Sequence, residues 1–341
     1  MKRIKTKDAV GHILCHDMTR IVKGEIKDAV FRKGHIITEE DIPVLLSMGK
    51  DHIYIYEVKK SMIHEDDAAI VLSDLSINDN MLVTEVKEGK VELVATCDGL
   101  FQVDVEKLNK INELEDIMIA TRMANLPVKA GDKLAGMRVI PLVIEEDKLN
   151  RAREIAENDP ILKLTPFRKL RAGVITTGNE VYHGRIKDTF TPVIEEKLKN
   201  MNIEMVKHLI SDDDTEKIKA NILEMKNYNL DLIICTGGMS VDPDDLTPAA
   251  IKSSGANIIT YGAPVLPGAM FLLAYFDDDT TIMGIPGCAM YKNITIFDLI
   301  LPYVCADIKI DKSHIAKLGY GGLCLDCDIC HYPNCQFGKG V

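Results

Sequence analysis

The chain has 341 residues, 46% of them hydrophobic and 27% charged, which is enough for two or three domains with buried cores. A formal net charge of -11 disfavours a nucleic acid as partner, because a phosphate backbone requires clustered Lys and Arg. The sequence contains neither a long apolar run nor the apolar core of a signal peptide. It therefore predicts a cytoplasmic protein with no membrane partner, in which the nine cysteines stay reduced.

The first part of the chain predicts a small α+β region over residues 1–62 and a β-rich module over residues 63–148. In the small region, "EEDIPVLLSMGK" has helical spacing and "HIYIYEV" alternates like a strand. His64 is expected in an exposed loop before the first strand of the module. The strands predicted for the module are "AAIVLS", "MLVTEV", "KVELVATC", "IMIATRM" and "MRVIPLVI".

The second part predicts an α/β domain that follows a helical linker over residues 149–170. From residue 171 to 305, apolar strand segments such as "AGVITT", "IEMVKHLI" and "LDLIIC" alternate with helical segments. This alternation predicts a largely parallel sheet covered by helices. Residues 288–304 are expected to form a single helix, and residues 306–341 a cysteine-rich tail.

Three predicted strands of this domain end in loops that contain glycine. Gly178 follows "VITT", Gly237 and Gly238 follow "LIICT", and Gly287 follows "MGIP". Parallel strands of an α/β domain bind ligands at their carboxyl ends, and glycines let backbone N–H groups approach an anion. Hydroxyl groups such as those of Thr177 and Ser240 suit a phosphate. The three loops are therefore predicted to meet in one anion-binding cleft.

Asp242, Asp244 and Asp245 follow the Gly-Gly turn. Three carboxylates so close together repel one another, and Mg²⁺, which prefers oxygen ligands, would relieve that repulsion. The alternative is an ordinary strand–helix connection in which Asp244 or Asp245 caps the following helix. The sequence by itself leaves both interpretations open.

Four motifs, in the order "TTGNEV", "DLIICTGGMSVDPDDLTPAAI", "APVLPGAMFLLAY" and "GIPGCAMY", resemble the molybdopterin-binding domain of the MoeA/MogA type. The resemblance covers about residues 171–305. It implies a three-layer α/β/α fold, molybdopterin as ligand and a homo-oligomer. It also implies a role in molybdenum cofactor biosynthesis that includes molybdate transfer to molybdopterin, the reaction of a molybdopterin molybdenumtransferase.

The resemblance also implies roles for individual residues, because the family uses its Gly-Gly loop for phosphate and its Pro-Gly loops for the pterin. The catalytic residues implied are Glu180, Asp242 and Asp245, with Mg²⁺ or molybdate held by Asp244 and Asp245. The cofactor-binding residues expected are Thr177, Gly178, Asn179, Asp188, Gly237, Gly238, Ser240, Pro267, Gly268, Pro286 and Gly287.

Two other functions compete with molybdate transfer. Asn179 stands where the family has an acidic residue and Cys288 where it has Asn. The Asn179 substitution and the appended cysteine tail favour a non-catalytic molybdopterin carrier or sensor. The segment "DPDDLTP" is also similar to the loop of the competence-damage-type pyrophosphatases, which share the fold. That similarity implies a Mg²⁺-dependent dinucleotide pyrophosphatase.

The tail carries Cys324, Cys327, Cys330 and Cys335 with the spacing C-x₂-C-x₂-C-x₄-C. Two-residue gaps let successive thiolates converge on one centre, and the run is close to that of a bacterial ferredoxin. An iron–sulfur cluster is favoured slightly over zinc, and His331 could replace one thiolate. The alternative is a flexible, redox-sensitive tail. Cys288 is expected at a helix N-terminus, where a thiolate is favoured.

Overall fold

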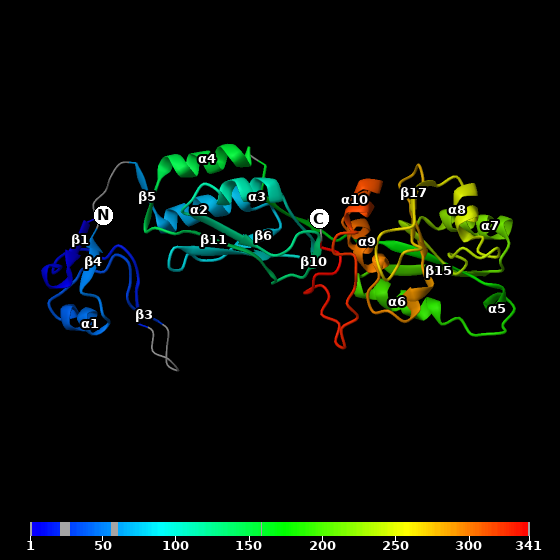
Figure 1. Ribbon diagram of the computed structural model, residues 1–341, viewed down its shortest axis with the longest axis horizontal. Coiled ribbons are helices and arrows are strands. Elements are labelled where there is room, and N and C mark those ends of the chain that lie inside the picture. The colour runs from blue at the N-terminus through cyan, green and yellow to red at the C-terminus, as the bar shows by residue number, and fades with distance from the viewer. Residues whose placement is uncertain (1, 21–27, 56–60, 158, 340–341) are drawn as a thin grey trace. The chain divides into compact units, whose positions relative to one another are not determined.

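The computed structural model describes residues 2–20, 28–55, 61–157 and 159–339 (Figure 1). The chain divides into two compact units. The first comprises residues 1–96, 103–122 and 131–163, and the second comprises residues 97–102, 123–130 and 164–341. Within the described ranges, no helix has the length and apolar character that crossing a membrane requires.

The first unit begins with a small region whose core contains Leu14, Ile37, Leu45 and Ile53. Strands β1 and β4 pair antiparallel, as do β2 and β3. The predicted helix is present, and so is the strand that follows it, although residues 56–58 of that strand lie outside the described residues. The elements are β1 (Lys2–Lys5), η1 (Thr6–Asp8), β2 (Met18–Arg20), β3 (Asp28–Phe31), α1 (Asp41–Ser47) and β4 (His52–Ile55).

The rest of the first unit is an antiparallel sheet of order β6-β7-β11-β9 that packs against helices. Helix α2 lies on β7 and β11, and α4 packs against α2 and α3. A two-stranded pair joins β5 and β12. The elements are β5 (Met62–His64), α2 (Glu65–Ser76), β6 (Met81–Val83), β7 (Lys90–Ala95), α3 (Val105–Asn112), β9 (Ile117–Thr121), β11 (Lys133–Val139), β12 (Val143–Glu145) and α4 (Glu146–Ala156).

Two predictions for this region are wrong. The segment "AAIVLS" is not a strand but the middle of α2, where Ala68, Ala69 and Leu72 are buried on one side at helical spacing. His64 is not an exposed loop residue, since it is 4% exposed and its Nδ1 accepts a hydrogen bond from the Asp66 N–H at 3.2 Å. His64 therefore caps the helix, and three acidic residues in the first turn complement the helix dipole.

The second unit contains a six-stranded sheet of order β15-β14-β16-β19-β18-β17. The first four strands are parallel, and β18 and β17 run antiparallel at one edge, so the predicted α/β class is confirmed with a mixed sheet. A separate sheet of order β10-β8-β13 precedes it in the chain. The strands are β8 (Gly99–Val103), β10 (Leu126–Val128), β13 (Leu162–Pro166), β14 (Arg171–Thr177), β15 (Glu204–Ser211), β16 (Leu232–Thr236), β17 (Asn257–Tyr261), β18 (Leu272–Tyr275) and β19 (Thr281–Ile285).

Helices cover both faces of this sheet, because successive strand residues point to opposite sides. Val174 and Ile234 pack in one apolar cluster with α6 and α9, whereas Ile175 and Ile233 pack in a second cluster with α7 and α8. The three-layer arrangement is visible in Figure 1. The helices are α5 (Asn179–Tyr182), α6 (Phe190–Asn200), α7 (Thr215–Met225), η2 (Lys226–Tyr228), α8 (Thr247–Ser253), η3 (Gly287–Met290), α9 (Ile296–Cys305) and α10 (Lys312–Lys317).

The single helix predicted over residues 288–304 is wrong. A short 3-10 turn, η3, ends at Met290, and α9 begins only at Ile296. Thr295 accounts for the interruption, because it forms a capping box: its hydroxyl accepts from the Phe297 N–H, and its own N–H donates to Asp298 Oδ2 at 2.8 Å. A capping box fixes the first residue of a helix and thereby separates α9 from the preceding loop.

Candidate functional site

The carboxyl ends of β14, β16 and β19 lie side by side at one edge of the sheet. These strands are parallel neighbours, and Thr176 pairs with Thr236, which in turn pairs with Ile285. The loops that follow them are the glycine-containing loops of the sequence analysis. Their shared edge is where open α/β sheets bind ligands.

The loop after β14 and the loop after β16 are in direct contact. The Thr177 hydroxyl donates to the Thr236 carbonyl oxygen at 3.2 Å, and it lies 3.1 Å from the Thr247 hydroxyl. Thr247 in turn donates to the Gly237 carbonyl oxygen at 3.0 Å. All three threonines are buried, so the Thr177 hydroxyl supports the loops from beneath.

The glycines of the second loop are required by space and by backbone conformation. A Cβ atom on Gly237 would overlap the Thr177 carbonyl oxygen, and one on Gly238 would lie 2.8 Å from Thr247 Oγ1. Both residues have positive φ, +85° and +55°. The N–H groups of Gly238 and Ser240 have no acceptor within the described part of the chain. They are therefore donors suited to an anion.

The third loop adjoins the second. A Cβ atom on Gly284, near the end of β19, would overlap the Met239 side chain, so β19 passes directly beneath the Gly-Gly loop. Pro286 is buried, while Gly287 is exposed and would have open space around a Cβ atom. Gly268 is buried at the start of α9, where the Ile296 N–H donates to the Pro267 carbonyl oxygen at 3.3 Å.

The Asp residues of the second loop shape a turn. The Asp242 N–H donates to Asp245 Oδ2 at 3.0 Å, and the Asp245 N–H donates to the Asp242 carbonyl oxygen at 2.9 Å. No side chain caps α8, so neither Asp244 nor Asp245 serves as its N-cap. Asp242 and Asp244 are exposed at the loop surface.

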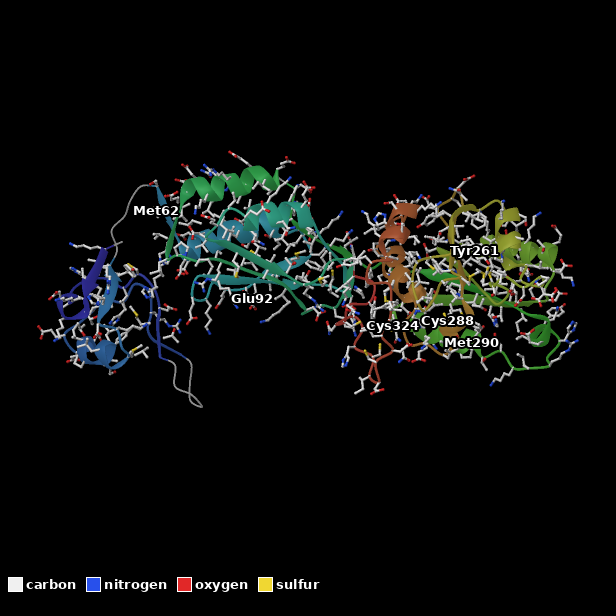
Figure 2. All side chains as sticks on the ribbon, in the orientation of Figure 1. Met62, Glu92, Tyr261, Cys288, Met290 and Cys324 are labelled. Atoms are coloured by element: carbon white, nitrogen blue, oxygen red, sulfur yellow. The ribbon has the colours of Figure 1, made fainter. Side chains whose placement is uncertain are left out.

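Tyr261 holds the same loop from the edge strand β17. Its hydroxyl donates to the carbonyl oxygens of Met239, at 3.1 Å, and of Ser240, at 2.9 Å. Partial burial and the charge of Asp245 raise the pKa of Tyr261, so the phenol stays protonated as a donor. Figure 2 labels this side chain.

Carboxylates from three loops gather beside the first turn. The Asn179 N–H donates to Asp213 Oδ2 at 2.8 Å, and the Asp213 N–H lies 3.5 Å from Asn179 Oδ1. Burial raises the pKa of Asp213, and the charges of Glu180, Asp244 and Asp212 raise it further. This electrostatic coupling requires Glu180 and Asp244 to lie near Asp213. The first and second loops thus share one acidic rim.

Asp188 lies below the rim and faces buried hydroxyl groups. It accepts from the Thr191 hydroxyl at 2.6 Å, from the Thr176 hydroxyl at 3.1 Å and from the Phe190 N–H at 2.8 Å. Burial would raise the pKa of Asp188, but these hydrogen bonds outweigh it and lower that pKa. His208 Nε2 lies 3.0 Å from both threonine hydroxyls and 3.5 Å from Asp188 Oδ2.

His208, Asp213, Tyr261 and Thr247 were missed by sequence reasoning. His208 lies in the middle of β15 and Asp213 lies just after that strand. Tyr261 is the last residue of β17, an antiparallel strand much later in the chain. Their places depend on strand order, which no local pattern gives. The one available signal was the position of Asp213 just beyond a strand that the sequence did predict.

The donor groups for a metal are present without being assembled. In the part of the chain that the structure describes, no three His, Cys, Asp or Glu side chains are grouped so as to hold a metal ion. The Mg²⁺ site at Asp244 and Asp245 therefore stays a prediction.

Cys288 is half-buried, and burial raises the pKa of its thiol more than Lys292 lowers it, so the expectation of a favoured thiolate is wrong.

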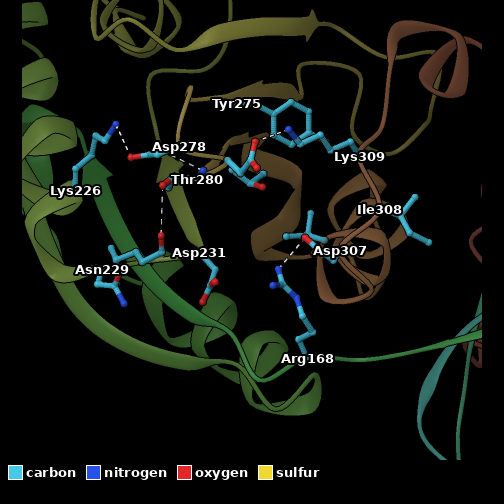
Figure 3. Close-up of a pocket in the computed structure, with 14 residues that line it drawn as sticks. Arg168, Lys226, Asn229, Asp231, Tyr275, Asp278, Thr280, Asp307, Ile308 and Lys309 are labelled. Atoms are coloured by element: carbon cyan, nitrogen blue, oxygen red, sulfur yellow. Dashed lines mark hydrogen bonds and ion pairs between the residues drawn. The ribbon is translucent and has the colours of Figure 1, made fainter.

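A cavity of about 350 Å³ lies at the opposite edge of the sheet, where β16 and β19 begin (Figure 3). Its charged side chains other than Asp231 pair with one another: Arg168 with Asp307 at 2.9 Å, Lys226 with Asp278 at 2.9 Å, and Lys309 with Asp279. The Asp231 carboxylate accepts a hydrogen bond from the Arg171 N–H at 2.8 Å. Because the paired charges are already neutralised within the protein, the cavity offers a ligand little beyond its shape. The glycine loops remain the better candidate.

A three-layer α/β domain with glycine loops over adjacent parallel strands defines a class that binds anionic ligands at this edge. Comparison with known proteins agrees. Residues 173–306 match the family described as "Probable molybdopterin binding domain". Residues 3–57 match a family described as a domain of unknown function.

Individual relatives cover only parts of the chain. A CinA-like protein of Mycobacterium marinum is 38% identical over 77 residues, 23% of this chain and 18% of its own length. The chain thus spans about a fifth of such curated relatives. Among solved structures, the molybdopterin biosynthesis enzyme MoaB of Thermus thermophilus is 21% identical with a TM-score of 0.32, covering 39% of this chain and 91% of its own. The tungsten cofactor synthesizing protein MoaB of Pyrococcus furiosus is 19% identical with a TM-score of 0.34, covering 40% and 93%.

Proposed function

We propose that the second unit binds molybdopterin at the glycine-loop edge and acts in molybdenum cofactor biosynthesis. The observation that carries this proposal is the contact between the first two loops, in which the hydroxyls of Thr177 and Thr247 support the Gly237–Gly238 turn. The N–H groups of Gly238 and Ser240 in this loop have no acceptor among the described residues. The family match over residues 173–306 supports the choice of ligand.

In this proposal the backbone holds the terminal phosphate. The N–H groups of Gly238 and Ser240 donate to phosphate oxygens, while exposed Gly287 and buried Pro286 border the pterin side. Pro267 and Gly268 support that border through the start of α9. A phosphate beside the rim formed by Glu180, Asp213 and Asp244 requires a cation, and Mg²⁺ held by Asp244 and Asp245 would supply it.

Molybdate transfer is the finer form of the proposal. Asp242, Asp245 and Glu180 would position molybdate and the cation, so that the contribution of the protein is orientation and charge neutralisation. Asn179 replaces the acidic residue of the family, but its N–H binds the carboxylate of Asp213 at 2.8 Å. A carboxylate is therefore retained beside this turn, which favours an active site over a carrier that lost its acid.

Binding is tested by titrating the anaerobically purified full chain with molybdopterin in a calorimeter. Ser240→Pro removes one of the two N–H donors, and Ser240→Ala keeps it. We expect Ser240→Pro to weaken binding by at least ~10-fold, since each donor to an anion contributes about 1.5–3 kcal/mol. Ser240→Ala should bind normally. Equal affinity in both variants, with circular dichroism showing both folded, would refute the proposed phosphate site.

Transfer is tested by adding molybdate and Mg²⁺ to the same complex and measuring molybdenum that stays with the protein after desalting. The second candidate, a Mg²⁺-dependent dinucleotide pyrophosphatase, is favoured by the exposed carboxylates of Asp242 and Asp244 in the second loop, of which Asp244 belongs to the acidic rim. Incubation with ADP-ribose and Mg²⁺ decides between them, because release of a nucleoside monophosphate belongs only to the hydrolase. Binding of molybdopterin without either reaction leaves the carrier. The homo-oligomer also stays a prediction, and light scattering tests it by measuring the molar mass of the protein in solution.

A further inference from the structure

Residues 321–338 form a closed loop, here called the cysteine loop. The Gly338 N–H donates to the Gly321 carbonyl oxygen at 2.9 Å, so the loop begins and ends at one point. Phe337, which is 3% exposed, anchors the end of the loop in the apolar core next to α9. The tail is thus a folded segment tied to the second unit, which disfavours the alternative of a flexible tail.

All four cysteines of this loop line one cavity of about 290 Å³. Cys324 and Cys335 are half-buried, Cys327 and Cys330 are exposed, and none of the four is in a disulfide. His331 borders the same space. Closure of the loop therefore turns a linear C-x₂-C-x₂-C-x₄-C run into four thiols around a shared volume.

Two lysines contact residues of the cysteine loop. Lys292, in the segment between η3 and α9, forms an ion pair with Asp326 at 2.7 Å and lines the cavity. The ammonium of Lys339, which is buried, contacts the carbonyl oxygens of Pro333 and Cys335.

The thiols share the cavity without being arranged around a centre, as no metal-holding group of three donors exists among the described residues. Cys327 and Cys330 are at the surface, where side chains change rotamer freely. A metal that displaces the thiol protons would draw these two inward toward Cys324 and Cys335.

We propose that the cysteine loop binds one thiophilic metal centre, zinc or an iron–sulfur cluster, through the thiolates of Cys324, Cys327, Cys330 and Cys335, and that the loaded centre fixes the segment Leu266–Gly268. The metal part is independent of the proposed molybdopterin site. Only the proposed coupling between the metal centre and Pro267 and Gly268 involves residues of the proposed molybdopterin site.

The coupling follows from main-chain hydrogen bonds. The Leu266 N–H donates to the Gly322 carbonyl oxygen at 2.8 Å, and the Cys324 N–H donates to the Leu266 carbonyl oxygen at 2.8 Å. Leu323 and Leu266 form a parallel β-bridge. The first metal-binding cysteine is thus bonded directly to the residue before Pro267, and restraining Cys324 restrains that segment.

The test begins with full-length protein purified without oxygen, in which metals are counted by mass spectrometry and acid-labile sulfide is assayed. Separate samples are reconstituted with zinc alone or with ferrous iron and sulfide. One zinc per chain without sulfide identifies a zinc centre, and sulfide with visible thiolate-to-iron absorption identifies a cluster. A chain that holds neither after both treatments, or that forms a Cys–Cys disulfide within the loop instead, overturns the proposal.

Variants separate the ligand set from general thiol binding. Cys327→Ser and Cys330→Ser change exposed residues and should leave folding intact while weakening metal retention by at least ~10-fold, since even loss of outer-shell partners costs that much. Cys97→Ser, outside the cavity, is the matched control and should retain metal. His331→Ala should also retain it. If His331→Ala loses the metal and one cysteine variant does not, the four-thiolate set is wrong.

Hydrogen exchange of the same samples tests the coupling. Removing the metal with a chelator should speed exchange in peptides that cover residues 264–270 and 321–338, and leave peptides from α7 unchanged. Unchanged exchange at 264–270 in a chain that does bind metal would refute the coupling alone. None of these measurements uses molybdopterin, so their failure is distinct from failure of the proposed function.

Discussion

Thr177 Oγ1 lies 3.1 Å from Thr247 Oγ1, although 70 residues separate them in the chain. Thr177 ends β14 and Thr247 begins α8, so this contact joins the first and second glycine loops. Both residues are buried, and their hydroxyls bond the carbonyl oxygens of Thr236 and Gly237. The contact is the structural basis of the shared edge at which we place the ligand.

Thr247→Val keeps the shape of the side chain and removes its hydroxyl. The Gly237 carbonyl oxygen then loses its donor, which should lower the free energy of unfolding by about 1–3 kcal/mol and weaken molybdopterin binding. Chemical denaturation and calorimetry measure the two effects. Ser253→Ala, which removes a hydroxyl bonded within the last turn of the same helix, is the control and should leave ligand binding unchanged. Normal binding by Thr247→Val would show that the loop does not need this support.

Gly237→Ala and Gly287→Ala form a matched pair. A Cβ on Gly237 meets the Thr177 backbone at positive φ, so that variant should lose about 2–4 kcal/mol in the free energy of unfolding. A Cβ on Gly287 has no atom within 4 Å, and its effect on stability should stay within about 0.5 kcal/mol. If Gly287 borders the pterin, Gly287→Ala should nevertheless weaken molybdopterin binding. A normal affinity for that variant would remove Gly287 from the site.

Tyr261→Phe removes the donor that holds the Met239 and Ser240 carbonyl oxygens. Hydrogen exchange over residues 239–246 should become faster, because the loop loses its link to β17, while global stability changes by only about 0.5–1.5 kcal/mol. Tyr320→Phe changes an 83% exposed tyrosine and serves as the control. The role of Tyr261 would be disproved by equal exchange rates in the two variants.

The pH dependence of stability should report on His208. Burial lowers the pKa of His208 in the folded state, so the unfolded chain binds a proton first as the pH falls below about 6.5. The contribution of His208 to stability should therefore be constant above that pH. It should decline as the pH falls from about 6.5 to the lower pKa of His208 in the folded state. His208→Gln should flatten this decline in denaturation curves measured from pH 8 to pH 5. A decline of the same slope in the variant would assign it to other groups.

Asp188 contributes to pH dependence in a lower range. Its pKa is lowered in the folded state, so its contribution is present above the unfolded value near 4 and is lost as the pH falls through the folded pKa. His208 faces Asp188 Oδ2 at 3.5 Å, and both contact Thr176 and Thr191. The effect of His208→Gln must consequently be read above pH 5, where Asp188 remains ionised.

Much of the second unit was predictable from local sequence. The strands around Val174, Ile234 and Met283 are short apolar runs. Asp214 caps α7, with its carboxylate accepting from the Glu216 and Lys217 N–H groups. Prediction failed where a local pattern is ambiguous. "AAIVLS" fits a buried strand or one face of a helix equally well, and only packing of α2 on β7 and β11 selects the helix.

The sequence by itself determined which segments alternate as strands and helices, where glycines end the strands, and that four cysteines share one short run, because each of these depends on neighbouring residues along the chain. Only the tertiary structure decided that Thr177 meets Thr247, that Asp213 lies beside Asn179, that His208 faces Asp188, and that Cys324 is bonded to Leu266. These contacts depend on strand order and loop closure, which arise from burial of the sheet on both faces rather than from any local pattern.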